Sequence, residues 1–276
     1  MIDICNLTVV CVDTINHRLA LIALNKTLMS IKPKRCLLFS DMNPDLNNNN
    51  AIEIIPINKL ESINEYNDFI LKRMVFFIDT THALIVQYDG YVINPQAWRD
   101  DFLNYDYIGA VWPFRPDDRC VGNGGFSLRS KKLLEALTDS SIVSDSPEDD
   151  VICLIFRDYL EKTYKIRFAD KYIASYFSVE KSYTTICPFG FHGIFNLNKF
   201  LSDSDINEFI IHSHTSIFRK LEFIELIHNL FIEKRIRIAL SCASKSLLNK
   251  NYPAVLLSVL RNHLTEGELE SFLAHI

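Results

Sequence analysis

The sequence is poor in glycine and lacks both long apolar runs and paired cysteines. Only 8 of its 276 residues are glycine. No apolar stretch approaches membrane-spanning length, and the chain opens without a basic leader or a small-residue cleavage site. Its 7 cysteines are scattered and have no C-x-x-C spacing, which argues against a disulfide framework and a zinc site. We therefore expect a soluble cytoplasmic protein, at most peripheral to the inner membrane, with free thiols.

The charge balance is also modest. The formal net charge is -5, from 34 acidic and 29 basic residues, and 48% of the residues are hydrophobic. Such a chain has no general attraction for nucleic acid, so we expect no nucleic-acid partner. A negatively charged ligand would have to be held by local groups. The length predicts one large domain, with or without a small appendage.

The first third of the chain alternates apolar runs with helical patterns. We expect strands at 7–13, 35–41, 51–57 and 82–89, helices at 16–31 and 62–74, and a surface loop at 41–50. Three aspartates, Asp13, Asp41 and Asp89, each close one of these strands. Parallel strands bind ligands at their carboxyl ends, so these carboxylates should gather along one edge of the sheet.

The remainder of the chain changes character toward its end. We expect strands at 105–112 and 166–180, and helices at 129–137 and 147–164. The pattern is almost wholly helical from about Asp205, with Pro253 at a helix start and Gly267 near a break. The sequence thus predicts an α/β fold, with a mixed sheet flanked by helices in residues 1–204 and a helical appendage in 205–276.

The appendage offers several interpretations. Its segment 219–240 mixes apolar and basic residues. This segment could pack on the first domain, form a homo-oligomer or lie on a membrane surface. Packing is the interpretation we prefer.

Three of the glycines fall within the stretch "VGNGGFSLRS" at 121–130. Glycine is used where the backbone needs a positive φ or where another group must come close to it. Asn123, Gly124 and Gly125 could present backbone amides and a side-chain amide to a sugar. A β-hairpin turn explains the same residues equally well.

The stretch "QYDG" places an acid directly after an apolar strand. A carboxylate at a strand end can bind a divalent cation that bridges a diphosphate, and Gln87 points to the same side as Asp89. A strand-ending aspartate is more often a turn former.

Two further stretches contain candidate chemical groups. "PEDD" puts Glu148, Asp149 and Asp150 at a helix start, where acids cap the helix or serve as a general base. "FGFHG" places His192 in a loop, where its imidazole could complete a metal site, although a lone histidine is more often structural. We rank His192 above the pair His212 and His214.

Taken in order, these motifs resemble a known family. "LIVQYDGYVINPQAW", "YDYIGAVW", "VGNGGFSLRS", "PEDDV" and "FGFHG", across about residues 80–195, look like a bacterial family of glycosyltransferase-like proteins formerly described as a domain of unknown function. That family is similar to GT-A glycosyltransferases, and the order of "GGFS" and "EDD" resembles metal-dependent galactosyltransferases. The resemblance implies a nucleotide-sugar donor, such as a UDP-sugar, and a glycan or other hydroxyl acceptor.

The resemblance also implies roles for individual residues. Asp89 matches the last acid of a D-x-D motif that holds Mn²⁺ or Mg²⁺ and the diphosphate, with Gln87 in place of the first acid. His192 would complete the metal site, and Asp150 or Asp149 would be the catalytic base. The remaining expected contacts to donor or acceptor are Asp13, Thr14, Trp112, Asn123, Gly124, Gly125 and Glu148.

The implied reaction inverts the anomeric carbon. Breaking the glycosidic bond leaves charge on the nucleoside diphosphate, which a divalent ion neutralises, while a carboxylate on the opposite face takes the proton of the acceptor hydroxyl. A retaining transferase of the same fold is one alternative. A catalytically inactive carbohydrate-binding or scaffold protein is another, because Gln87 replaces an expected acid. Trp112 could stack on a sugar or belong to the core.

Overall fold

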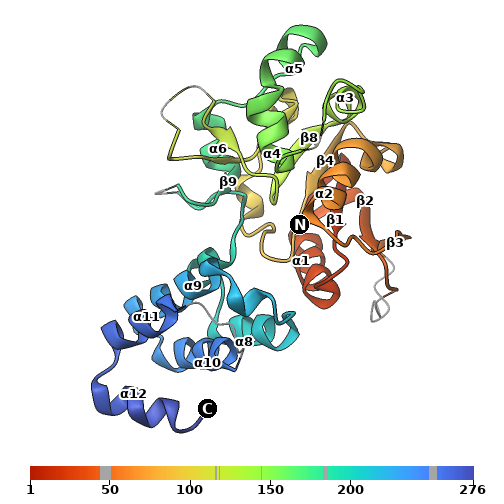
Figure 1. Cartoon of the computed structure of the whole chain (residues 1–276). Helices are drawn as coiled ribbons and strands as arrows, with labels where there is room; N and C mark the ends of the chain where they lie inside the picture. Colours follow the sequence, from red (N-terminus) through yellow and green to blue (C-terminus); the bar gives the residue numbers. More distant parts are fainter. Residues whose placement is uncertain (44–50, 116, 118, 144, 183–185, 249–253) are drawn as a thin grey trace. The chain divides into compact units, whose positions relative to one another are not determined.

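The computed structural model describes residues 1–43, 51–115, 117, 119–143, 145–182, 186–248 and 254–276. These residues form two compact units, Met1–His192 and Gly193–Ile276. Figure 1 traces both along the chain. The sequence had suggested a division after residue 204, twelve residues later than the division between the two units. Pro253 and most of the Asn-rich stretch lie outside the described residues.

The described part of the first unit is built on a six-stranded sheet of order β3-β2-β1-β4-β8-β5. Its strands are β1 (Ile2–Val12), β2 (Ile31–Ser40), β3 (Glu53–Pro56), β4 (His82–Ile85), β5 (Tyr107–Ile108) and β8 (Ser127–Ser130). Strands β1 to β4 run parallel, and β8 pairs antiparallel with both β4 and β5. Short pairs β6 (Ala110–Val111) with β7 (Val121–Gly122), and β9 (Ser178–Val179) with β10 (Gly190–Phe191), complete the strands. The predicted mixed sheet is confirmed.

Helices of the first unit connect these strands. They are α1 (His17–Ser30), α2 (Ile63–Asp68), η1 (Phe69–Arg73), η2 (Met74–Phe77), η3 (Pro95–Ala97), η4 (Asp100–Asn104), α3 (Lys131–Ala136), α4 (Glu148–Asp150), η5 (Val151–Ile155), α5 (Arg157–Tyr164) and α6 (Lys171–Phe177). Both η1 and η5 are π-helical, so the expected single helices at 62–74 and 147–164 change geometry along their length. Side-chain caps set several starts, since Ser62 accepts a hydrogen bond from the Glu65 amide.

Two segments differ from the sequence-based expectation. The expected helix at 129–137 begins only at Lys131, because Arg129 and Ser130 still belong to β8 and the Ser130 side chain caps α3. Much of the expected strand at 166–180 is helix α6, whose first turn is capped by the Asp170 side chain at the Ile173 amide. In both places a capping side chain overrides the apolar pattern.

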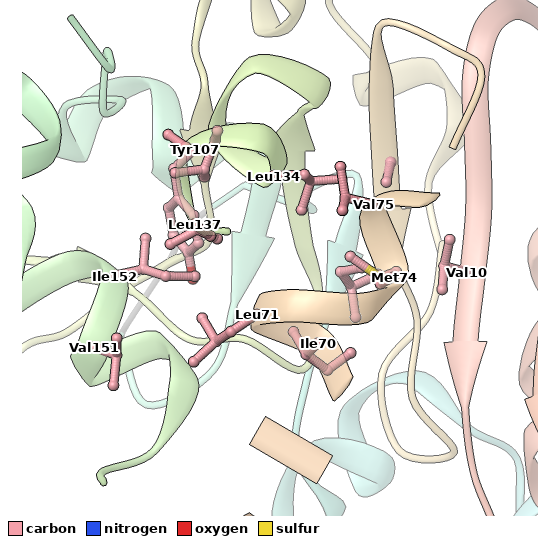
Figure 2. Close-up of a cluster of buried hydrophobic side chains, with 14 of the residues drawn as sticks. Val10, Ile70, Leu71, Met74, Val75, Tyr107, Leu134, Leu137, Val151 and Ile152 are labelled. Atoms are coloured by element: carbon pink, nitrogen blue, oxygen red, sulfur yellow. The ribbon is translucent and has the colours of Figure 1, made fainter. Parts of the chain in front are cut away.

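A buried apolar cluster covers one face of the sheet. It joins β1 and β2 to the helical segment 69–77, to α3 and to η5. Figure 2 shows Met74 and Val75 between Val10 of β1 and Leu134 of α3. The central strand β1 is buried from Leu7 to Val12, as expected of a parallel strand with neighbours on both sides. This packing fixes the carboxyl ends of the strands, where the candidate site lies.

The second unit is helical, as predicted. Its helices are η6 (Ile194–Asn196), α7 (Leu197–Phe200), α8 (Asp203–His212), η7 (Ile217–Arg219), α9 (Leu221–Ile232), α10 (Ile236–Leu247), α11 (Val255–His263) and α12 (Glu266–Leu273). Helix α9 buries an apolar stripe and contacts both α10 and α11. Gly267 lies in the first turn of α12, just after the break that ends α11. Across the described residues, no helix combines the length and apolarity needed to cross a membrane.

Candidate functional site

The carboxyl end of β4 turns back on itself at Gln87–Gly90. The Gln87 amide donates to the Gly90 carbonyl at 3.1 Å, and the Gly90 amide donates to the Gln87 carbonyl at 3.0 Å. This tight turn places Asp89 at its tip, where the side chain is buried. A Cβ at Gly90 would lie 2.9 Å from both the His192 ring and the Phe191 carbonyl oxygen. The turn can therefore pack against "FGFH" only because residue 90 is glycine.

His192 lies between two carboxylates. Its Nε2 is 3.5 Å from Asp89 Oδ1, and its Nδ1 is 3.5 Å from Glu180 Oε1. Burial by itself lowers the pKa of His192, but the two carboxylates outweigh burial and raise it to about 10. The ion pair acts in the other direction on Glu180, whose pKa is lowered although burial alone would raise it. The imidazole is therefore protonated at neutral pH.

Gln87 connects this histidine to the half-buried Tyr66. Its Nε2 donates to the Tyr66 hydroxyl at 2.6 Å, and its Oε1 lies 3.2 Å from His192 Nε2. Burial raises the pKa of Tyr66 well above its usual value, so the hydroxyl stays neutral. An amide can donate to Tyr66 and accept from His192 at once, which an ionised carboxylate cannot do. This dual contact gives a physical reason for glutamine at position 87.

Residues 121–125, which we call the glycine segment, lie directly against the same histidine. Asn123 has a φ of 68°, a left-handed conformation that asparagine tolerates, and its Nδ2 is 3.0 Å from His192 Nδ1. A Cβ on Gly125 would lie 2.1 Å from His192 Nε2, and one on Gly124 would lie 1.6 Å from Glu148 Oε1. The close approach predicted from the sequence is thus made by the protein's own side chains.

The acids of "PEDD" occupy three different environments at the start of α4. Glu148 is buried and paired with Arg129 Nη2 at 2.8 Å. Asp149 accepts hydrogen bonds from the Gly124 amide at 3.3 Å and the Asp150 amide at 3.1 Å. Asp150 is half-buried, and burial together with the Asp149 carboxylate raises its pKa, against the opposing charge of Arg115. Asp150 therefore combines partial exposure with a raised pKa.

Asp13 and Thr14 lie at the end of the neighbouring strand β1. Asp13 Oδ1 accepts from the amides of Ile15 and Asn16 at 2.7 and 2.5 Å, so the carboxylate closes the turn into α1. Burial raises the pKa of Asp13 despite these bonds, and the charge of Asp89 adds to the rise. This coupling follows from the sheet, since β1 and β4 are adjacent parallel strands. Of the three strand-ending acids expected to gather, Asp13 and Asp89 therefore interact at this edge, while Asp41 pairs with His17 at 2.7 Å.

A surface pocket opens beside Thr14. Its volume is about 920 Å³, and it lies between the end of β3 and α2. Leu60, on its wall, donates its backbone amide to Thr14 Oγ1 at 3.2 Å. The lining holds two bases and three acids, and both bases are paired within it: Lys59 with Glu61 and Arg73 with Asp68, each at 3.3 Å.

Trp112 belongs to the buried apolar cluster. Its side chain is 5% exposed, and its ring fills the space beside Gly122, where a Cβ would lie 2.0 Å from it. The exposed ring next to it is Phe114, which stacks on Trp112 at a centroid distance of 5.8 Å and is 69% exposed. Of the two interpretations of Trp112, the geometry favours the core.

The structure adds three residues that the sequence analysis did not select. Glu180 faces His192, Tyr66 faces Gln87, and Arg129 pairs with Glu148. Glu180 closes the segment 166–180, which was interpreted by its apolar pattern, and Arg129 belongs to the stretch 121–130, which was interpreted by its glycines. No spacing rule connects Tyr66 to residue 87, so tertiary packing was needed to find it.

The donor atoms near His192 suit a divalent cation of the Mn²⁺ type. Asp89 offers a carboxylate, Gln87 an amide oxygen and His192 an imidazole nitrogen; Asp89 Oδ1 lies 3.5 Å and Gln87 Oε1 3.2 Å from His192 Nε2. Among the described residues, no cluster of three or more His, Cys, Asp or Glu side chains is arranged to hold a metal.

The chain belongs to a family defined by its sequence pattern. A family model described as "Protein of unknown function (DUF5672)" matches residues 49–192, more than half of the chain. That range contains every candidate residue from Tyr66 to His192. A search of curated proteins gave no match.

Two solved structures resemble the chain weakly. One is the mannosyltransferase PcManGT from Pyrobaculum calidifontis, solved in complex with GDP-Man and Mn²⁺. Its TM-score is 0.42 at 10% identity, with 97% of this chain and 83% of that chain covered. The other is A197 from STIV, with a TM-score of 0.33 at 14% identity, covering 62% of this chain and 83% of that chain. Neither similarity assigns a ligand or a reaction to this protein.

Proposed function

We propose that this protein is a glycosyltransferase, which moves a sugar from a nucleotide-sugar donor to an acceptor hydroxyl. One observation carries the proposal. The glycine segment contacts His192, the partner of Asp89, through Gly125 and contacts Glu148 and Asp149 through Gly124. In this proposal, the cation and diphosphate bind on the His192 side of this loop and the base lies on the other side.

The nucleotide lies along the carboxyl edge of the parallel strands in this proposal. Asp13 and Thr14 close β1, and the pocket beside Thr14 is large enough for a nucleoside. A UDP-sugar is the donor we expect.

Asp89 and His192 hold the divalent ion in this proposal, and Gln87 supports them. The ion neutralises charge on the departing diphosphate when it is bound. Coordination through Nε2 requires a neutral imidazole, so the proton held by His192 must leave that nitrogen first. Glu180 remains on the other side of the ring, where it can keep Nδ1 protonated and the imidazole oriented.

Asp150 is the proposed general base. Its carboxylate is half-buried and its raised pKa increases its affinity for the acceptor proton. Asp149 is committed to the Gly124 and Asp150 amides and holds the local backbone. A base on the face opposite the leaving group gives inversion. Determining the anomeric configuration of the product by NMR distinguishes this outcome from retention.

One observation favours a second candidate, a sugar-binding protein without activity. Gln87 replaces an acid and is held by Tyr66 and His192. The full chain should be incubated with UDP- and GDP-sugars and Mn²⁺, and nucleoside diphosphate release measured. Release with transfer to an acceptor supports the transferase. Binding of a nucleotide sugar, measured by calorimetry, without turnover supports the second candidate. If neither turnover nor binding is observed, both candidates are contradicted.

A further inference from the structure

A fully buried arginine lies beneath the glycine segment. The Arg129 side chain is 0% exposed. Its Nε donates to Ser127 Oγ at 3.0 Å, and its Nη2 donates to Glu148 Oε1 at 2.9 Å and to the Gly124 carbonyl at 3.4 Å. The guanidinium also lies 5.6 Å from the centre of the Tyr107 ring. One side chain on β8 therefore connects the loop to the start of α4.

Stability alone does not explain this arrangement. Removing a guanidinium and a carboxylate from water is costly, and an apolar pair of similar size often serves the fold as well or better. Glu148 also fills the space that a side chain at residue 124 would need, which fixes the distance between loop and helix. The next residue, Asp149, accepts the Gly124 amide. The ion pair thus sets the geometry of the groups around the proposed base.

We propose that Arg129 is a positioning residue, which holds Glu148 against Gly124 and thereby aligns Asp149 and Asp150 with the glycine segment. This inference rests on the proposed function for its kinetic consequence, but its structural part stands independently. Arg129 itself reaches no substrate, because its side chain is covered on all sides. Its effect on the reaction is transmitted through Glu148 and through the hydrogen bonds that Asp149 accepts from the Gly124 and Asp150 amides.

The test uses the double variant Arg129→Met/Glu148→Leu, which replaces both charges together. Because neither charge is then left unpaired, the protein should fold. We expect the donor KM to change by less than about 3-fold, whereas kcat falls about 10- to 100-fold, since small displacements at a reacting centre reduce rate rather than binding. Hydrogen–deuterium exchange of the peptide containing Gly124 should be faster than in the wild type.

Arg157→Met is the matched control. Arg157 is also largely buried and pairs with Glu161 at 2.9 Å, but within α5 and away from the glycine segment. We expect this variant to lose stability without a change in kcat or in exchange at Gly124.

The outcomes separate the two proposals. Wild-type kcat and wild-type exchange at Gly124 in the double variant overturn the positioning role. Inactivity of the wild type on every donor overturns the proposed function, while the exchange measurement still tests the positioning of the loop. If the double variant does not fold, Arg129→Lys replaces it. Lysine keeps the charge but cannot span Glu148, Ser127 and Gly124 together, so the same loss of kcat and faster exchange are expected.

Discussion

Gly125 lies directly against the imidazole of His192. A Cβ at this position would come within 2.1 Å of Nε2, and the same nitrogen lies 3.5 Å from Asp89 Oδ1. The neighbouring Gly124 meets Glu148 in the same way. The chain has only 8 glycines, and two of them lie where the side chains of His192 and Glu148 contact the backbone too closely for a Cβ atom. The segment is a junction between the two halves of the candidate site.

The first prediction concerns this contact. Gly125→Ala should destabilise the protein by about 1–3 kcal/mol, because the added methyl group must displace His192. Transferase activity should fall with it. Thermal unfolding and initial rates measure the two effects. Gly267→Ala is the matched control, since nothing lies within 4 Å of that position in α12, and it should be neutral or stabilising by up to about 1 kcal/mol. If the two variants have equal stability and equal activity, the proposed contact between residue 125 and His192 does not matter for fold or function.

The second prediction concerns the proposed cation site. Asp89→Asn should weaken Mn²⁺ binding by more than about 100-fold, since changes to groups that merely support a ligand already cost 10- to 100-fold. Titration calorimetry with Mn²⁺ alone measures this without reference to turnover. Asp3→Asn is the control, because Asp3 is exposed and forms a surface ion pair with Lys32. Unchanged Mn²⁺ affinity in Asp89→Asn removes Asp89 from the site.

The third prediction concerns the base. Asp150→Asn should lower kcat by about 10²–10⁴-fold while nucleotide-sugar binding persists, since the carboxylate acts on the acceptor proton only. In the wild type, kcat should fall as the pH drops through the raised pKa of Asp150, because protonation removes the base. The variant should lack this acidic limb. An Asp150→Asn enzyme with wild-type kcat shifts the role to another group.

The fourth prediction concerns stability and pH through His82, which starts β4. Burial lowers the pKa of His82, against a hydrogen bond to the Tyr105 carbonyl and the charge of Asp106. Because the folded state binds the proton less well than the unfolded state, the contribution of His82 is present above about pH 6.5 and is lost as the pH falls through the folded-state pKa. The contribution of His82 to the free energy of unfolding should therefore decrease on acidification, whereas that of His192, whose pKa is raised, should increase.

His82→Gln isolates this effect, because glutamine can still donate to the Tyr105 carbonyl. Urea unfolding should be followed at pH 8 and pH 5 by tryptophan fluorescence, since Trp98 and Trp112 both lie in Met1–His192. The variant should lose less stability than the wild type between the two pH values. His275→Gln, at an exposed position, should behave like the wild type. A His82→Gln protein as acid-sensitive as the wild type contradicts the assignment.

The sequence predicted the parallel strands and their order of appearance well. Apolar runs such as Leu7–Val12 can only be strands buried on both faces, and a strand-ending acid marks the carboxyl edge wherever the strand lies. It predicted the region 166–180 poorly, because Asp170 caps a helix over a pattern rich in aromatic residues. A side chain that caps a helix stabilises it against the alternative strand, and the apolar periodicity of the sequence contains no information about such a hydrogen bond.

Sequence alone also determined which chemical groups are available near residues 87–90, 121–125, 148–150 and 192, because those residue types are rare elsewhere in the chain or stand at strand and helix ends. Tertiary structure alone decided their partners. Glu180, Tyr66 and Arg129 reach the site from separate elements, and their contacts with His192, Gln87 and Glu148 depend on packing across the sheet rather than on spacing along the chain. Folding then set the protonation of His192 and Asp150. At His192 the carboxylates of Asp89 and Glu180 outweigh burial, whereas at Asp150 burial and the Asp149 carboxylate act together, and these balances exist only in the folded protein.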